Sequence, residues 1–207
     1  MAMLSGIILR RSAAAAMRSI LVTGVQGVGK STVARIIGGL LGIGTLNYAN
    51  LMLEADLTVG GRDEFVTWSW EKRMSLYQSV ELILPNLFGP RSRDAEQLAL
   101  LENHLSVRHG GELRTFPHGS IALYAPAAIL VLESGSDEIA MRRRMDGSRL
   151  RSVESIDQIE TQQSLNWDEA ESIAARYRLP LTRIENQLAE VTARVAASWV
   201  SRNCITE

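Results

Sequence analysis

The segment that most constrains this chain is the run of eight residues 24–31, Gly-Val-Gln-Gly-Val-Gly-Lys-Ser. A short apolar run with β-branched residues, 19–23, comes directly before it, and a helical pattern extends over residues 30–41. The glycines allow the backbone to curl so that successive N–H groups face inward, beside the N-terminus of the helix. A strand, such a loop and a helix in succession predict an α/β fold that binds phosphate groups.

The motif G-x-x-x-x-G-K-[ST] assigns different roles to the last two residues of the loop. Lys30 supplies a mobile cation for the β- and γ-phosphates of a nucleotide, and the Ser31 hydroxyl is placed to bind Mg²⁺. The alternative is a chance match in a strand-to-helix turn, but the flanking elements weigh against it. The residues expected to bind the nucleotide are Gly24, Gln26, Gly27, Val28, Gly29, Lys30, Ser31 and Thr32.

Strands alternate with helices along the rest of the chain. Further strands are expected at residues 43–47, 97–101, 127–133 and 179–184, and further helices at 50–57, 70–84, 136–145, 155–177 and 186–200. Pro85 is expected to close the helix before it, Ser136 to cap the helix that it begins, and residues 107–120 to be a loop. The alternation predicts a three-layer P-loop NTPase sandwich, with helices on both faces of a parallel sheet of about five strands.

Length and composition limit the class of protein. The chain has 207 residues, which suits one domain, and its formal net charge of −1 does not favour nucleic acid or an anionic membrane as a partner. No apolar run reaches the ~18 residues that span a bilayer. The single cysteine, Cys204, excludes an internal disulfide, and a cytoplasmic location is the simplest expectation. Residues 1–17 are interpreted as a flexible extension, because Arg10 and Arg11 follow their apolar stretch instead of preceding it.

Charged residues further along the chain are candidates for the chemistry. Glu102 follows a predicted strand, where a carboxylate near a phosphate loop helps to hold Mg²⁺ or its waters; the alternative is a solvated carboxylate. His104 either positions an acceptor or is a surface histidine without chemistry. Arg62 follows two glycines and either binds a phosphate of the acceptor or pairs locally.

Arginines gather at residues 142–144, 149 and 151. Three consecutive helical residues cannot share one face, because neighbours are ~100° apart around the axis. Some of these arginines are therefore expected to be solvated or to pair with Asp137, Glu138 or Asp146. The others are suited to phosphoryl transfer, in which negative charge spreads over the moving oxygens.

Five segments together resemble the archaeal-type adenylate kinases, which are P-loop nucleoside monophosphate kinases. The segments, in the same order as in that family, are VTGVQGVGKST (22–32), Asn47-Tyr48, Arg62-Asp63-Glu64, Glu102-Asn103-His104 and SDEIAMRRRMDGSR (136–149). Members of the family transfer the γ-phosphate of ATP to AMP with Mg²⁺, have a short lid and are often trimeric. The resemblance implies a P-loop kinase domain at residues 18–207, with ATP and Mg²⁺ as its cofactors and a small-molecule acceptor as its partner.

The resemblance also implies roles for particular residues. The acceptor would lie along about 47–88 and the lid at about 142–155, and the chain would form a homo-oligomer, a trimer or a dimer. The expected catalytic residues are Lys30, Glu102, Arg142 and Arg149, with Ser31 and, through water, Glu102 on the metal. The expected acceptor residues are Asn47, Arg62, His104 and Arg108, and Asn186 would begin the loop on the adenine side.

The chain departs from the family pattern on the acceptor side. Glu102 stands where the family has an aspartate, and RDEFV at 62–66 lacks the second arginine of the family. The Pro- and Gly-rich loop that follows the histidine in the family is replaced by HGGELRTFPHG, of which only the preceding Arg108 fits. The donor half of the site is therefore predicted to be retained and the acceptor half to be altered.

Three functions follow from these observations. Phosphotransfer from ATP to a nucleoside monophosphate such as AMP is the first expectation. A kinase that acts on a hydroxyl acceptor is the second, and it requires Glu102 to act as a base. A regulatory ATP-binding switch is the third, although the chain lacks the N-K-x-D motif of guanine-specific switches.

The C-terminal helix, with Leu188, Val191 and Val195, is expected to cover the sheet or a subunit interface.

Overall fold

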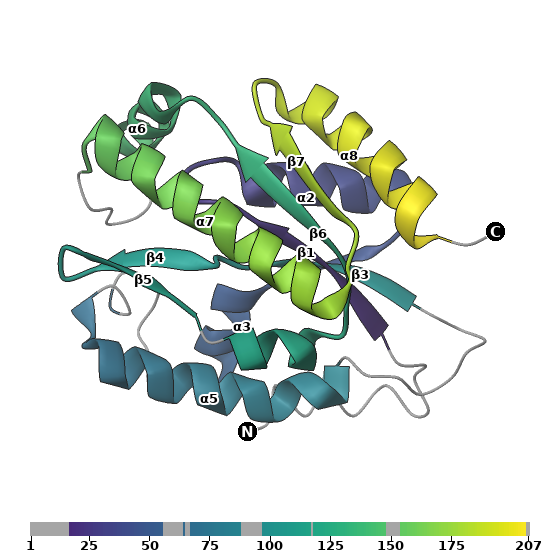
Figure 1. Ribbon diagram of the computed structural model, residues 1–207, viewed down its shortest axis with the longest axis horizontal. Helices are drawn as coiled ribbons and strands as arrows, with labels where there is room; N and C mark the ends of the chain where they lie inside the picture. Colours follow the sequence, from purple (N-terminus) through teal and green to yellow (C-terminus); the bar gives the residue numbers. More distant parts are fainter. Residues whose placement is uncertain are drawn as a thin grey trace.

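A five-stranded parallel sheet forms the centre of the fold (Figure 1). The computed structural model describes residues 17–55, 64, 67–87, 97–116, 118–147 and 154–205. The strands of the sheet are β1 (Met17–Thr23), β2 (Gly44–Asn47), β3 (Gln97–Glu102), β6 (Pro126–Glu133) and β7 (Leu181–Glu185), and their order is β2-β3-β1-β6-β7. Every pairing in this sheet is parallel, as the alternation of strands and helices predicted.

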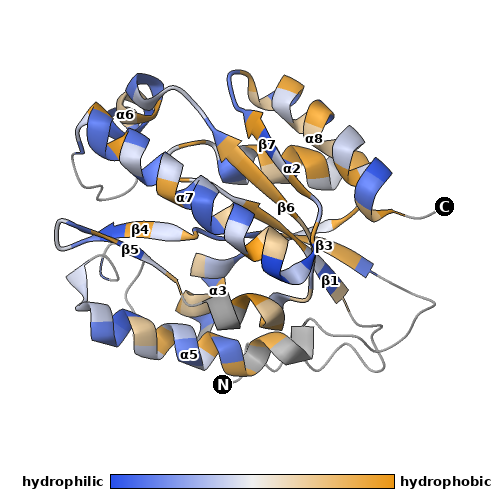
Figure 2. Cartoon of the chain, viewed as in Figure 1, coloured by the Kyte–Doolittle hydropathy of each residue, from blue (hydrophilic) through white to orange (hydrophobic). Residues whose placement is uncertain are grey.

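The central strands β1 and β6 are buried on both faces because each is an almost continuous apolar run. Ile20 and Val22 of β1 point to one face and Leu21 to the other, and all three side chains are fully buried. Figure 2 shows the same strands as hydrophobic ribbons between helices of mixed character. Strands of this kind occur where helices cover both faces of a parallel sheet.

Two groups of helices cover the sheet. On one face, α2 (Lys30–Leu41) and α8 (Ala189–Cys204) enclose the apolar cluster around Ile20, Ile37 and Leu130. On the other face, α3 (Tyr48–Ala55), α5 (Trp70–Leu87) and α7 (Ile156–Tyr177) enclose the cluster around Leu21 and Leu101. Helix α6 (Ser136–Met145) lies beside the start of α7 (Figure 1). These three layers confirm the predicted sandwich.

The prediction of a loop at residues 107–120 was wrong. Strands β4 (Ser106–His109) and β5 (Glu112–Thr115) form an antiparallel hairpin, and a 3₁₀ helix, η1 (His118–Tyr124), follows. Gly110 and Gly111 connect the two strands with φ values of 59° and 84°. Two successive residues of positive φ make the tight turn whose twist suits a hairpin, and glycine adopts that conformation without strain.

Two predicted helix ends were also wrong. Helix α5 passes Pro85 and ends at Leu87. Proline has a helical φ, and near the end of a helix its missing N–H removes only one hydrogen bond. Helix α6 has Gly135 as its N-cap, with no side-chain cap, and Ser136 is its first helical residue. Helix α7 does begin at a serine cap, because Ser155 and Gln158 form a reciprocal capping box.

The remaining predicted boundaries differ from the structure by a few residues, for example at β7, predicted at 179–184. Pairing with β6 continues past the end of β7, because the Asn186 N–H donates to the Glu133 carbonyl at 2.6 Å. None of the helices among the described residues is long and apolar enough to cross a membrane.

Truncating Leu130 to alanine tests the packing of the sheet. Its side chain is 0% exposed at the centre of β6. We expect Leu130→Ala to lower the free energy of unfolding by about 2–5 kcal/mol, because it removes buried methyl groups and leaves a cavity. The measurement is urea denaturation. Leu82→Ala is the control, since Leu82 is 80% exposed on α5, and a loss of similar size in both variants would contradict this placement.

Candidate active site

The phosphate loop 24–31 lies at the carboxyl end of β1, the middle strand of the sheet. Its glycines have positive φ values, 144° at Gly24, 85° at Gly27 and 96° at Gly29. At Gly29 space is also restricted, because a Cβ atom there would lie 2.5 Å from the side-chain nitrogen, Nδ2, of Asn186. This loop therefore needs glycine for its conformation and for the close approach of a second segment.

Lys30 folds back over the loop from the first turn of α2. Its Nζ donates to the carbonyl oxygens of Gly24, at 2.7 Å, and Val25, at 2.9 Å, and only 8% of the residue is exposed. The lysine lies in the curve of the loop, which is where a phosphate group would meet its ammonium group. The role of Lys30 on the β- and γ-phosphates, which the motif predicts, stays a prediction.

Glu102 joins three elements at the carboxyl edge of the sheet. Its Oε2 accepts a hydrogen bond from the Ser31 hydroxyl at 2.5 Å and another from the Asn47 side chain at 3.1 Å. The ends of β2 and β3 are in register, since Asn47 is paired with Glu102. A hydroxyl and a carboxylate at this distance are an oxygen donor set of the kind that Mg²⁺ prefers, so these residues fit the metal that the motif implies.

His104 lies against the phosphate loop. Its Nδ1 is 2.9 Å from the Gly24 carbonyl oxygen and 3.2 Å from the Lys30 Nζ. A carbonyl only accepts and an ammonium only donates, so the tautomer decides which of the two bonds His104 makes. Asn103 accepts a hydrogen bond from the His104 N–H at 2.8 Å and donates to the Tyr124 hydroxyl at 3.3 Å, which orients this turn.

The consecutive arginines of α6 take three different positions. Arg142 donates to the Val28 carbonyl at 3.3 Å and forms an ion pair with Glu138 at 2.5 Å, one of the pairings expected from the sequence. Arg143 is buried and donates to the Gln26 carbonyl at 2.8 Å, whereas Arg144 is exposed. The sequence identified Arg142 as a site residue but gave no reason to choose Arg143.

Asn186 holds the phosphate loop from the far edge of the sheet. It is 2% exposed, and its side chain donates to the Val28 carbonyl at 2.7 Å. Its own carbonyl accepts from the Ser134 hydroxyl at 3.1 Å. The residue expected to begin the adenine-side loop thus touches the backbone of the phosphate loop.

Arg108, predicted on the acceptor side, lies on the β4–β5 hairpin. Its Nη1 donates to the Gly111 carbonyl at 2.8 Å, and its Nε is 3.8 Å from a carboxylate oxygen of Glu154. The same oxygen of Glu154 is 3.0 Å from the Arg143 Nη1. Glu154, which sequence reasoning missed, therefore connects the hairpin to the helix that contacts the phosphate loop. The predicted site residues Arg62 and Arg149 lie outside the described residues.

Aromatic and basic side chains fill the space between the hairpin and α5. The Trp70 ring lies 5.7 Å from the His109 ring and 5.9 Å from the Phe116 ring, and the Arg114 guanidinium is 5.1 Å from the Trp70 centroid. Burial lowers the pKa of His109, and the nearby charges of Arg73 and Arg114 lower it further. Glu71 and Glu112 act on the same pKa in the opposite direction, and Arg114 forms an ion pair with Glu112 at 2.6 Å, so basic and acidic groups lie together here.

The fold and the phosphate loop together define a P-loop kinase. The glycine loop, the lysine, the serine–carboxylate pair and the arginines are the parts that phosphoryl transfer requires, which are groups that position phosphates and neutralise their charge. A family model described as an AAA domain matches residues 23–160. The chain belongs to this AAA-domain family of P-loop proteins.

Curated relatives match most of the chain. The adenylate kinase of Thermoplasma volcanium is 30% identical over 154 residues, which cover 72% of this chain and 80% of that protein. The adenylate kinase of Thermococcus sibiricus is 28% identical over 173 residues, 81% of this chain and 85% of that protein. These comparisons support the kinase family in which the sequence resemblance lies.

Solved structures with the same fold include kinases that are not named adenylate kinases. Shikimate kinase from Acinetobacter baumannii has a TM-score of 0.59 and 15% identity, and the match covers 92% of this chain and 96% of that one. A gluconokinase from Sinorhizobium meliloti has a TM-score of 0.52 and 18% identity, with 89% and 92% covered. At such identities the likeness shows the fold alone.

Substituting Gly29 tests the geometry of the loop. We expect Gly29→Ala to weaken nucleotide binding at least tenfold, because the residue has a φ of 96° and a new Cβ would displace Asn186. Titration with a fluorescent ATP analogue measures the dissociation constant. Gly39→Ala is the matched control in α2, since a Cβ at Gly39 meets nothing within 4 Å. Equal affinity in both variants would contradict the role of Gly29.

Proposed function

We propose that this protein transfers the γ-phosphate of ATP to a nucleoside monophosphate such as AMP. The observation that carries this proposal is the similarity to adenylate kinases, which extends over 80% and 85% of the two relatives described above. A similarity confined to the phosphate loop would support only nucleotide binding. The extent of the match favours an acceptor of the same chemical class.

The donor half of the reaction follows from the residues around the phosphate loop. The loop N–H groups would surround the β-phosphate, and Lys30 would exchange its bonds to the Gly24 and Val25 carbonyls for phosphate oxygens. Ser31 would bind Mg²⁺ directly and Glu102 through water. When bound, the metal neutralises charge on the β- and γ-phosphates.

The arginines complete the donor half. Arg142 lies beside the Val28 carbonyl, and Arg149 belongs to the proposed lid at about 142–155. Both would neutralise charge on the equatorial oxygens during transfer. Asn186 would position the loop beside the adenine ring, because it already contacts Val28. The protein contributes positioning and electrostatics, which is what phosphoryl transfer demands.

We assign the acceptor to the segment at about 47–88 and to the β4–β5 hairpin, with Arg62, His104 and Arg108 as the proposed contacts. Asn47 would act indirectly, since its side chain holds Glu102 and accepts from the N–H groups at the start of α3.

A kinase acting on a hydroxyl acceptor is the second candidate, and one observation favours it. Glu102 already accepts a hydrogen bond from a hydroxyl group, that of Ser31, at 2.5 Å. A carboxylate in this position suits a base that takes the proton of an alcohol, a step that a phosphate acceptor does not need. The segment HGGELRTFPHG differs from the adenylate kinase pattern, which agrees with a different acceptor.

Replacing Lys30 tests the donor site. We expect Lys30→Ala to lower kcat at least about 100-fold while the protein stays folded, because the ammonium group serves the moving phosphate. Coupled assay of ADP formation measures the rate, and circular dichroism measures the fold. Arg202→Ala, an exposed residue near the end of α8, is the control for removing a cation. Unchanged turnover in Lys30→Ala would refute the assignment of the site.

An acceptor screen separates the two candidate functions. We expect ADP to form from ATP in the presence of AMP or another nucleoside monophosphate, and not with shikimate, gluconate or simple sugars. Steady-state assay across both sets gives kcat/KM for each acceptor. Activity with an alcohol and with none of the monophosphates would overturn the first proposal and support the second, in which Glu102→Gln abolishes activity.

A further inference from the structure

The strand β7 forms one edge of the five-stranded sheet, and the order of its hydrogen bonds shows which groups face outward. The Ile129 N–H donates to the Pro180 carbonyl, and the Asn186 N–H donates to the Glu133 carbonyl. In a parallel ladder, alternate residues of a strand face the same neighbour. Residues 180, 182, 184 and 186 therefore face β6, and the backbone groups of Leu181, Arg183 and Glu185 face outward. No other described strand pairs with this edge.

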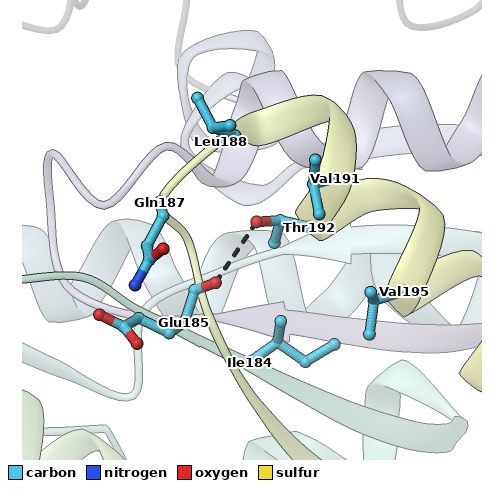
Figure 3. Close-up of a pocket in the computed structure, with 7 residues that line it drawn as sticks. All are labelled: Ile184, Glu185, Gln187, Leu188, Val191, Thr192 and Val195. Atoms are coloured by element: carbon cyan, nitrogen blue, oxygen red, sulfur yellow. Dashed lines mark hydrogen bonds between the residues drawn. The ribbon is translucent and has the colours of Figure 1, made fainter.

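A groove beside this edge is lined by apolar side chains and by the polar residues Glu185, Gln187 and Thr192 (Figure 3). Its cavity of about 280 Å³ lies between Ile184 of β7 and the outer side of the first turns of α8. Leu188, Val191 and Val195 line it and are 67%, 57% and 52% exposed. These residues form one stripe along α8, because their spacing is that of one helical face. An exposed strand edge next to an apolar stripe is a surface suited to another chain.

We propose that this surface binds a second copy of the same chain, with the two β7 strands antiparallel around a two-fold axis at Ile184. In that register Arg183 lies opposite Glu185 of the second copy, and the reverse pair lies on the other side of the axis. Arg183 and Glu185 are the residues whose backbone groups face outward. They would therefore form the hydrogen-bonded pairs, while the two Ile184 residues form the pair between them.

The charges of Arg183 and Glu185 favour this register over the registers in which the axis lies at Arg183 or at Glu185. An axis at Arg183 would place two arginines opposite each other, and an axis at Glu185 would place two glutamates opposite each other. Like charges in directly opposed positions are destabilising, whereas opposite charges stabilise a pair of strands. Arg183 and Glu185 are both exposed at the surface, so both side chains are accessible to a second chain.

The same symmetry buries the apolar stripe. A two-fold axis perpendicular to the sheet keeps both copies of α8 on one face of the joined sheet. Leu188, Val191 and Val195 would then face their counterparts across the junction, with ion pairs on the opposite face, where Arg183 lies over Trp167 of α7. A self-complementary patch with an apolar centre and paired charges is the arrangement that a two-fold dimer requires. The proposal is independent of the reaction that the protein catalyses.

Sedimentation equilibrium over a range of concentrations tests the dimer. We expect the wild-type chain to form dimers, and Val191→Asp and Val195→Asp each to raise the dissociation constant at least tenfold, because a charge enters the apolar centre. Leu82→Asp is the matched control, since it places a charge on an exposed leucine of α5 and should leave the dimer intact. A monomer at every concentration, or a trimer, would overturn the proposal.

Charge exchange tests the register without altering the apolar stripe. Arg183→Glu and Glu185→Arg should each weaken the dimer about tenfold, and the double variant R183E/E185R should restore it, because the opposite pairs reform across the axis. Arg183 also lies 3.6 Å from Glu133 of its own chain, so a thermal melt of each variant separates lost stability from lost association.

Backbone amide exchange provides a readout that depends on neither set of variants. In the dimer, the amides of Arg183 and Glu185 should exchange at least tenfold more slowly than in dilute monomer. The amides of Thr182 and Ile184, which face β6 in both states, should change much less. A dimer that leaves the Arg183 and Glu185 amides unprotected, or that the single and double charge variants do not affect, would show that another surface is used.

Discussion

Two carbonyl groups of the phosphate loop, those of Gln26 and Val28, accept hydrogen bonds from side chains far along the chain. Arg143 donates to Gln26 across 117 residues, and Arg142 and Asn186 donate to Val28 across 114 and 158 residues. The N–H groups of a phosphate loop point toward the ligand and do not form hydrogen bonds within the loop. Hydrogen bonds from other segments therefore have to stabilise the shape of the loop. Helix α6 and the end of β7 supply that support, and the loop is complete only when the whole sheet has formed.

The parallel sheet explains why the remaining site residues meet. Asn47 and Glu102 are the last residues of β2 and β3, and Ser31 follows the loop after β1, so all three lie at the carboxyl ends of neighbouring strands. In an α/β sheet these ends lie on one edge, where ligands bind. The packing of β1 and β3 therefore also determines the distance between the Ser31 hydroxyl and the Glu102 carboxylate. Stability and site geometry depend on the same register.

The sequence predicted those parts of the fold and site that depend on local pattern. The strands, the glycine loop and the position of Glu102 follow from periodicity and spacing, and the structure agrees with them. The choice between Arg142 and Arg143 depends on how α6 is rotated against the loop, which no local pattern contains. The hairpin at 106–115 was missed because Gly110-Gly111 is a turn signal surrounded by charged residues, without the alternation of a long strand. The site roles of Arg62 and Arg149 stay predictions, because both residues lie outside the described part of the chain.

One buried carboxylate links the two halves of the site. Glu154 lies between Arg143, which holds the phosphate loop, and Arg108, which lies on the hairpin. Removing one charge from a buried ion-paired group is destabilising, because the remaining charges lose a partner of opposite sign. The hairpin is the segment in which this chain departs most from the adenylate kinase pattern, yet Glu154 connects it to Arg143, which holds the phosphate loop. Arg108, Glu154 and Arg143 therefore form one charged group between the hairpin and the phosphate loop.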